Sequence, residues 1–194
     1  MNNKEIKEVV LPEGMERIDE VFCCCMSLEK VTLPSSFKFL CPGAFFECKN
    51  LKTVINLSKY PQTIYRYGEE VINATPALSR ADSDTNNDPF ENVDKDKCTL
   101  YVPQGCVDTY KSADCWKNFT NIKPLILADV NGDGYVNKND VETIKDYIMT
   151  GEAENFIFVN ADVNGDKVVN AADIVRIINI IKNNSSSGDD VNAD

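Results

Sequence analysis

The chain has 194 residues, 43% of them hydrophobic, with a formal net charge of −11 and no histidine. This length accommodates one ordinary domain or two small ones, and it excludes a full α/β barrel. The acidic composition argues against an electrostatic nucleic-acid binder. The absence of histidine excludes Ser-His and Cys-His catalysis. No apolar run is long enough to span a membrane, and the N-terminus lacks the apolar core of a signal peptide.

The acidic residues are concentrated toward the C-terminus. Residues 1–123 carry 15 basic and 18 acidic groups, whereas residues 124–194 carry 5 basic and 13 acidic groups. A charge step of this kind predicts a domain boundary and a C-terminal part that binds cations.

The N-terminal third of the chain contains a repeat. Its Leu-Pro pair and its Phe, Cys, Leu and Val positions recur at a nearly constant spacing. A repeat of this length, between 20 and 29, with fixed apolar positions is typical of a leucine-rich solenoid, in which each turn buries its apolar residues against the next. The runs LEKVTLP and LKTVINL are predicted to be parallel strands. The matching pairs are Leu11 and Leu33, Pro12 and Pro34, Phe22 and Phe45, Cys25 and Cys48, Leu28 and Leu51, and Val31 and Val54.

The motif AFFECKNLKTV, with its small-Phe-x-x-Cys turn before a strand, resembles the BspA-like leucine-rich repeats of bacterial surface proteins. The segment from Cys98, CTLYVPQGCVDTYKSADCWKNFTNI, is similar to the C-terminal cap of that family. The resemblance implies a strand at LYVP and a helix from near Gly105 to around Trp116. We therefore expect residues 1–123 to form leucine-rich repeats with a C-terminal cap.

A polar stretch interrupts the repeat between Tyr60 and Lys97. Within it, Asp82, Asp84 and Asn86 have the alternate spacing of the start of a calcium loop, but the twelfth position, Val93, has no carboxylate. A solvated loop is the preferred interpretation, and the regularity of the solenoid is not expected to hold here.

Eight cysteines raise the question of disulfides. Cys25 and Cys48 occupy equivalent repeat positions, where small buried thiols pack well, so core thiols are favoured over a disulfide framework. Whether any cysteines pair stays open at this point.

A second repeat lies in the acidic part, where DVNGDGYVNKND at 129–140 is followed in the same register by DVNGDKVVNAAD at 162–173. Calcium takes six to eight oxygen ligands, and a twelve-residue loop supplies them from positions 1, 3, 5, 7, 9 and 12. The pattern predicts two Ca²⁺ sites, in which position 7 donates its backbone carbonyl and position 9 binds directly or through water. Position 6 needs a left-handed backbone, which suits Gly134 better than Lys167 and predicts a weaker second site. The ligand sets are Asp129, Asn131, Asp133, Tyr135, Asn137 and Asp140, and Asp162, Asn164, Asp166, Val168, Asn170 and Asp173.

Each loop is followed by an amphipathic helix, whereas Pro124 stands where a helix before the first loop would run. The apolar faces are Val141, Ile144, Tyr147 and Ile148 in the first helix, and Ile174, Ile177, Ile178 and Ile181 in the second. Val136 and Val169, at position 8, are expected to join the loops as a short β-pair. The predicted fold class is α+β: a short leucine-rich-repeat solenoid with a small parallel sheet, a linker at 124–128, a small all-α domain of two calcium loop-helix half-hands at 129–184, and a disordered tail at 185–194.

The paired half-hands resemble a type I dockerin over roughly residues 127–183. The resemblance implies docking to a cohesin domain through loop positions 10 and 11 and the helix that follows. These positions lack the Ser-Thr type of pair frequent in the family, so the identity of the cohesin is not implied. Val175 and Ile180 widen the apolar arc of the second helix beyond what a two-helix domain buries, so part of this helix is expected to meet either a cohesin or the chain's own solenoid. Because large apolar side chains are better anchors than a solvated lysine, the second helix is favoured as the docking face. The candidate partner residues are Ala171, Ala172, Val175, Ile178, Asn179 and Ile180, together with Lys138 and Asn139 of the first repeat.

These observations indicate a non-catalytic, calcium-dependent protein–protein interaction protein. Its dockerin module docks to a cohesin, in a cellulosome-like or cell-surface assembly, while the repeats act as a cargo or ligand-binding module whose ligand is unknown. The alternative is a surface adhesin whose repeats bind a host or matrix protein and whose calcium domain is structural. No Walker loop, G-x-S-x-G, G-x-G-x-x-G or zinc motif supports an enzyme. We expect an extracellular or cell-surface protein whose export signal is missing from this chain through truncation.

Overall fold

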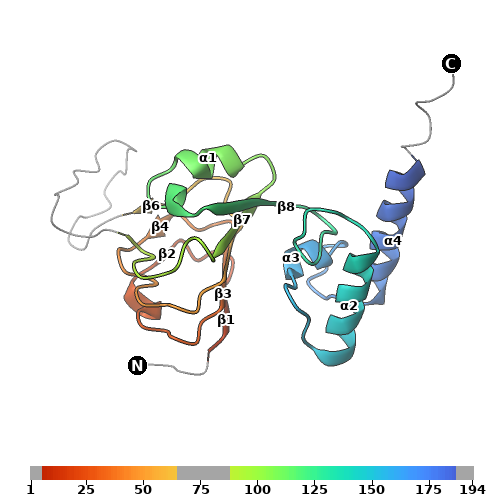
Figure 1. Cartoon of the computed structure of the whole chain (residues 1–194), viewed down its shortest axis with the longest axis horizontal. Helices are drawn as coiled ribbons and strands as arrows, with labels where there is room; N and C mark the ends of the chain where they lie inside the picture. Colours follow the sequence, from red (N-terminus) through yellow and green to blue (C-terminus); the bar gives the residue numbers. More distant parts are fainter. Residues whose placement is uncertain (1–5, 65–87, 187–194) are drawn as a thin grey trace, which may run out of the picture. The chain divides into compact units, whose positions relative to one another are not determined.

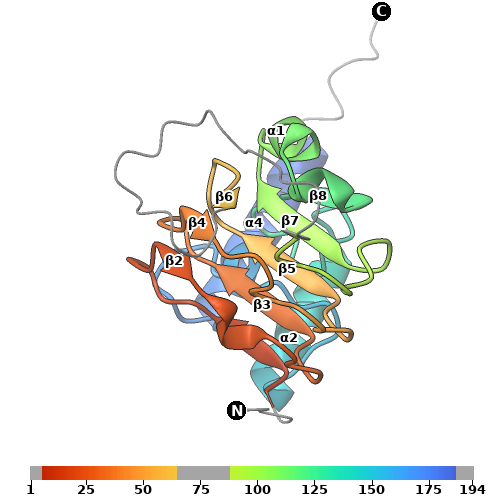
Figure 2. The same ribbon diagram turned by 90° about the vertical axis from the view of Figure 1, so that its left-hand side faces the viewer.

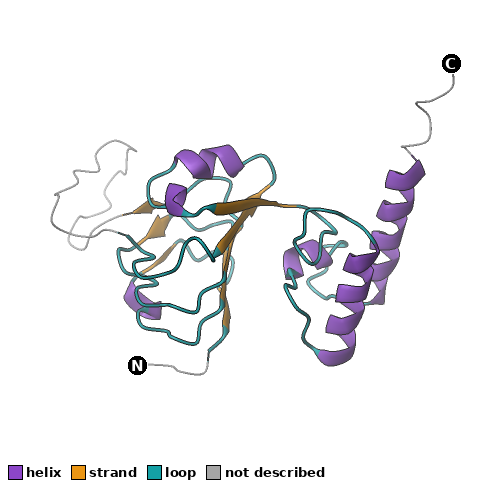
Figure 3. Cartoon of the chain, viewed as in Figure 1, coloured by secondary structure: helices purple, strands orange, loops and turns teal. Residues whose placement is uncertain are grey.

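The computed structural model describes residues 6–64 and 88–186, and the chain divides into two compact units, residues 1–124 and 125–194 (Figure 1). Short strands, turns and a few short helices form the first unit, and the longer helices lie in the second (Figure 3). This mixed α+β organisation is the one predicted from the two repeat types. Within the described residues, no helix is long and apolar enough to cross a membrane.

The first unit is a solenoid of parallel strands (Figure 2). The strands β1, β3, β5 and β7 pair in parallel, with Val9 opposite Val31, Val31 opposite Val54, and Val54 opposite Leu100. The predicted parallel strands are confirmed, because equivalent positions of successive turns lie in register. One sheet contains β1 (Glu8–Val10), β3 (Lys30–Leu33), β5 (Thr53–Asn56), β7 (Thr99–Pro103) and β8 (Asn121–Leu125), and the other contains β2 (Arg17–Ile18), β4 (Phe39–Leu40) and β6 (Thr63–Ile64).

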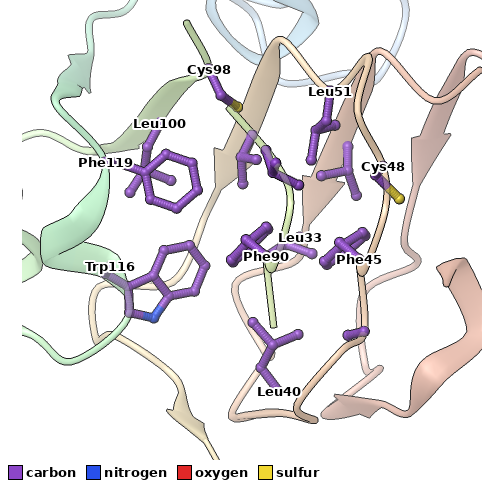
Figure 4. Close-up of a cluster of buried hydrophobic side chains, with 14 of the residues drawn as sticks. Leu33, Leu40, Phe45, Cys48, Leu51, Phe90, Cys98, Leu100, Trp116 and Phe119 are labelled. Atoms are coloured by element: carbon purple, nitrogen blue, oxygen red, sulfur yellow. The ribbon is translucent and has the colours of Figure 1, made fainter. Parts of the chain in front are cut away.

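A ladder of phenylalanine rings runs through the core of the solenoid (Figure 4). Phe22, at the end of the 3₁₀-helix η1 (Glu20–Phe22), stacks on Phe45 with the ring centroids 5.5 Å apart and the planes at 3°. Phe45 in turn stacks on Phe90, at 5.2 Å and 7°. The repeat is therefore present again at Phe90, which corrects the expectation of lost regularity for residues 88–97; residues 65–87 lie outside the described part of the chain. The Phe45 amide also donates to the Pro89 carbonyl at 2.8 Å, so the backbones of these turns run side by side. Asp82, Asp84 and Asn86, the weak calcium-loop candidate, lie outside the described residues.

The cap closes the ladder with edge-on aromatic rings. Trp116 and Phe119 meet Phe90 in T-shaped contacts, with centroids 5.3 and 5.1 Å away. The single helix expected from Gly105 to Trp116 is wrong: the structure has α1 (Val107–Ser112) and then a separate 3₁₀-helix, η2 (Trp116–Asn118). The helix breaks because Ala113 is extended and Cys115 has φ +65°.

The thiols of Cys25 and Cys48 lie in the core at equivalent positions of neighbouring turns, as predicted. Burial raises the pKa of the Cys48 thiol to about 12, so it stays protonated and behaves as a small apolar side chain. All eight cysteines are free thiols in this structure.

The second unit contains α2 (Lys138–Thr150), α3 (Phe158–Ala161) and α4 (Ala171–Ser186). Val141, Ile144 and Ile177 are buried in its core, and Ile174, Ile178 and Ile181 pack partly against it. Ile148, assigned to the buried face of α2, is instead 43% exposed. Part of the expected linker 124–128 is structured, since β8 reaches Leu125 and Ala128 is buried. The helix α4 extends to Ser186, into the tail expected to be disordered, and the rest of that tail lies outside the described residues.

Candidate calcium-binding loops

The first loop, residues 129–140, is closed by the carboxylate at its twelfth position. Asp140 is fully buried, and its Oδ1 accepts a hydrogen bond from the Val130 amide at 2.7 Å while its Oδ2 accepts one from the Asn137 amide at 2.8 Å. The Asn137 side chain caps α2 by accepting from the Asn139 amide at 2.8 Å, and Asn137 and Asp140 together form a capping box. Asp140 therefore fixes both the beginning of the loop and the beginning of the helix that leaves it.

The other side chains of the first loop turn inward on the loop's own backbone. Asn131 Oδ1 accepts from the Asp133 amide at 2.9 Å, and Asp133 Oδ1 accepts from the Tyr135 amide at 2.8 Å. Asp129 Oδ2 accepts from the Gly134 amide at 3.0 Å. Side chains at positions 1, 3, 5 and 12 are thus held around one short stretch of backbone, which is the wrapping that a cation site needs.

The second loop, residues 162–173, repeats most of this network at the third, fifth and twelfth positions. Asp173 is fully buried and accepts from the amides of Asn164 at 3.2 Å and Asn170 at 3.0 Å. Asn164 Oδ1 accepts from the Asp166 amide, and Asp166 Oδ1 from the Val168 amide, both at 2.8 Å. The equal spacing in sequence is therefore matched by equivalent hydrogen bonds in space.

The sixth position distinguishes the two loops. Gly134 has φ +96° in the first loop, and Lys167 has φ +67° in the second. The left-handed backbone expected at this position is thus present in both, and only the second loop places a side chain on it. A non-glycine residue in that region is strained by about 1–2 kcal/mol.

The first position also differs. Asp162 accepts three amide hydrogen bonds, from Gly165 at 2.9 Å, Asp166 at 3.1 Å and Lys167 at 2.9 Å. Asp129 is only 2% exposed, and its Oδ1 is buried without a hydrogen-bond partner. The first loop therefore contains a buried carboxylate oxygen that no group among the described residues satisfies.

That unsatisfied oxygen tests whether the loop fits a cation. Burial raises the pKa of Asp129, and the charges of Asp140 and Asp133 raise it further, whereas the hydrogen bond from the Gly134 amide lowers it. An ionised carboxylate so placed is unfavourable unless a positive charge accompanies it. The oxygen-rich donor set suits a hard cation such as Ca²⁺, which would be held by Asp129, Asp133 and Asp140 with the amide and carbonyl oxygens of the same loop. Among the described residues, no three acidic or cysteine side chains form a ready-made cage, because the loop carboxylates accept hydrogen bonds from loop amides.

The short β-pair expected between Val136 and Val169 is not formed. Within the described part of this unit, neither loop contains a strand, and both side chains instead pack against the helical core. The side chains at position 7 point to solvent, with Tyr135 74% and Val168 56% exposed.

The predicted partner residues separate into two groups. Ile178 and Ile180 pack partly against the core of the helical unit, so they are less available to a partner than expected. Val175 is 58% exposed and has no part in that core. Ala171, Ala172 and Asn179 of α4 are exposed as well, as are Lys138 and Asn139 of α2.

One residue that sequence reasoning missed lies between the loops. The Asn160 side chain is buried, and its Nδ2 donates to the Asp129 carbonyl at 2.6 Å. The loop pattern gave no signal for it, because Leu127 occupies the equivalent place in the first repeat.

Comparison with known families agrees with the geometry of both units. Residues 1–94 match the family model of the BspA type Leucine rich repeat region (6 copies), and residues 127–182 match that of the Dockerin type I domain. No curated protein and no solved structure matches the chain at a significant level.

Proposed function

Because the chain carries a BspA-type leucine-rich repeat region followed by a dockerin type I domain, we propose that it is a non-catalytic assembly protein. The helical unit docks to a cohesin domain when its loops hold calcium, and the solenoid is the cargo or ligand-binding module carried into the assembly. The assembly is extracellular or on the cell surface, where both kinds of module are typical.

The observation that carries this proposal is the pair of equivalent loops, in which Asp129 places an unsatisfied buried oxygen. We expect two calcium ions, one in each loop. Each loop has three aspartates, so filling both sites would change the net charge of residues 124–194 from −8 to −4. Relief of this self-repulsion would stabilise the ordered loops and the helices that leave them.

The docking face is placed on α4, at Ala171, Ala172, Val175 and Asn179. Binding energy at interfaces concentrates in a few apolar anchors, and Val175 is the large apolar residue of this face that solvent reaches. The corresponding face of α2 presents Lys138 and Asn139, a polar surface that a cohesin complementary to an apolar face would not match. Docking is therefore expected in one orientation.

The test is a pull-down of the full chain with a panel of cohesin domains, in calcium and in EDTA. Calcium-dependent capture supports the proposal. Val175→Asp should abolish capture while leaving calcium binding intact, because Val175 lies outside both the loops and the core. The matched control is Lys138→Ala with Asn139→Ala on α2, which should cost little. The reverse pattern would move the docking face to α2, and equal retention by both variants would mean that the two orientations are interchangeable.

The adhesin alternative makes a different prediction for the same experiment. If the calcium loops only stabilise the chain, no cohesin will be captured, and binding to matrix proteins will reside in the solenoid whether or not EDTA is present.

A further inference from the structure

We propose that Asn160 couples the two loops, so that a cation in one loop raises the affinity of the other. This inference rests on the proposed calcium binding and concerns how the two sites communicate. Its basis is the contact between the segment that precedes the second loop and the first ligand of the first loop.

Three hydrogen bonds join these segments. The Asn160 side chain donates to the Asp129 carbonyl at 2.6 Å, the Ala128 amide donates to the Asn160 carbonyl at 2.9 Å, and the Ile157 amide donates to the Val130 carbonyl at 2.8 Å. The contacts thus fall on Asp129 and on both of its neighbours. They also hold Ala128 at φ +74°, a backbone conformation that is unfavourable for alanine.

The same segment leads directly into the second loop. Asn160 belongs to the short helix α3, and the amide of Asp162, the first ligand position of the second loop, donates to the Phe158 carbonyl of that helix at 2.9 Å. One short helix therefore connects the first ligand positions of both loops. Ordering Asp129 around a cation orders α3, and an ordered α3 places Asp162.

The connection has no counterpart in the other repeat. The position equivalent to Asn160 is Leu127, which is 54% exposed. The side-chain bridge is thus a single asymmetric feature of an otherwise repeated structure. Its effect is nevertheless mutual, because linkage requires each cation to change the affinity for the other by the same factor.

The full chain offers a probe that distinguishes the loops. Tb³⁺ takes the same oxygen ligands as Ca²⁺ and luminesces when a nearby tyrosine is excited. Tyr135 stands at position 7 of the first loop, whereas the second loop has Val168 there. Tyrosine-sensitised Tb³⁺ luminescence therefore reports on the first loop, and its loss in Tyr135→Leu confirms the assignment.

The experiment is a double-mutant cycle. Asp166→Ala disables the second loop, and Asn160→Leu removes the side-chain hydrogen bond while keeping the branching at Cγ, although the leucine side chain is larger. We expect Asp166→Ala to weaken Tb³⁺ binding at the first loop about five- to tenfold when Asn160 is present. In the Asn160→Leu background, the same substitution should change the affinity less than about twofold, because the coupling that is lost, about five- to tenfold, lies within the roughly two- to thirteenfold that one net hydrogen bond is worth. Asn160→Ala repeats the cycle with a smaller side chain, and far-UV circular dichroism verifies that the helices are kept.

Two results would overturn the inference. One is an unchanged affinity of the first loop after Asp166→Ala alone; the other is an equal weakening with and without Asn160. Both leave calcium binding itself in place. A wild-type chain that gives no tyrosine-sensitised signal would refute the cation site of the first loop, and the coupling with it.

Discussion

Lys167→Gly is expected to tighten calcium binding at the second loop. Lys167 has φ +67°, in a region that strains a non-glycine residue by about 1–2 kcal/mol. Glycine removes this strain, but it also gives the disordered loop more conformational entropy, which offsets about 0.4–1 kcal/mol of the gain. The net gain for the ordered loop is about 0.5–1 kcal/mol, and since tenfold in affinity corresponds to about 1.4 kcal/mol, calcium should bind about two- to fivefold more tightly.

Two controls separate backbone strain from charge. Lys167→Ala also removes a positive charge beside the site but keeps the strain, so Lys167→Gly should bind more tightly than Lys167→Ala by the same two- to fivefold. Gly134→Ala should weaken the first loop to a similar extent, because a Cβ there meets nothing within 4 Å and only the backbone is affected. Calorimetric calcium titrations in an Asp133→Ala background isolate the second loop. Equal affinities of the alanine and glycine variants would refute the strain argument.

Three further predictions concern stability. EDTA should lower the unfolding temperature of the helical unit in the full chain and leave that of the solenoid unchanged. A common shift of both temperatures would contradict independent unfolding of the two units. Phe90→Ala should destabilise the solenoid by about 3–5 kcal/mol in denaturant unfolding, because the buried ring ends the ladder, whereas Val21→Ala, at a side chain 68% exposed, should stay within about 0.5 kcal/mol. Burial raises the pKa of Cys48 and Cys98 to about 12, so the solenoid should be fully stabilised by these protonated thiols below about pH 9 and lose that contribution as the pH rises toward 12. Cys48→Ala should flatten this decline in melting temperature.

Periodic features of the structure could be predicted from the sequence because they depend only on the position of a residue within its repeat. The strand register of the solenoid follows from the nearly constant spacing of the repeat, and the structure pairs Val9, Val31 and Val54 accordingly. The left-handed backbone at Lys167 followed from its loop position in the same way. In both cases the same local conformation recurs at a fixed interval along the chain, so the sequence pattern alone predicts it.

Features of the places where a repeat is interrupted, or where two repeats differ, could not be predicted from the sequence. The return of the solenoid at Phe90 was hidden because Val93 lies where the preceding turn has Cys48, and because the interruption breaks the spacing. The bridge from Asn160 to Asp129 joins two distant parts of the sequence without a motif. The burial of Ile180 depends on how α2 and α4 pack, which the apolar arc of one helix does not determine.

The core stabilises the solenoid, and charged residues at its surface reinforce the register that the repeat sets. The rings of Phe22, Phe45 and Phe90 stack nearly parallel, and such apolar burial contributes most of the stabilisation without fixing which turn follows which. Ion pairs at the surface contribute only about 0–1 kcal/mol each. They are directional, however: in each pair a glutamate of one turn meets a lysine at the neighbouring position of the next turn, and a slipped turn would lose the pairing. Charge therefore reinforces the register that the repeat sets and the core stabilises, and the pairs that do so are Glu8 with Lys30, Glu16 with Lys38, and Glu29 with Lys52.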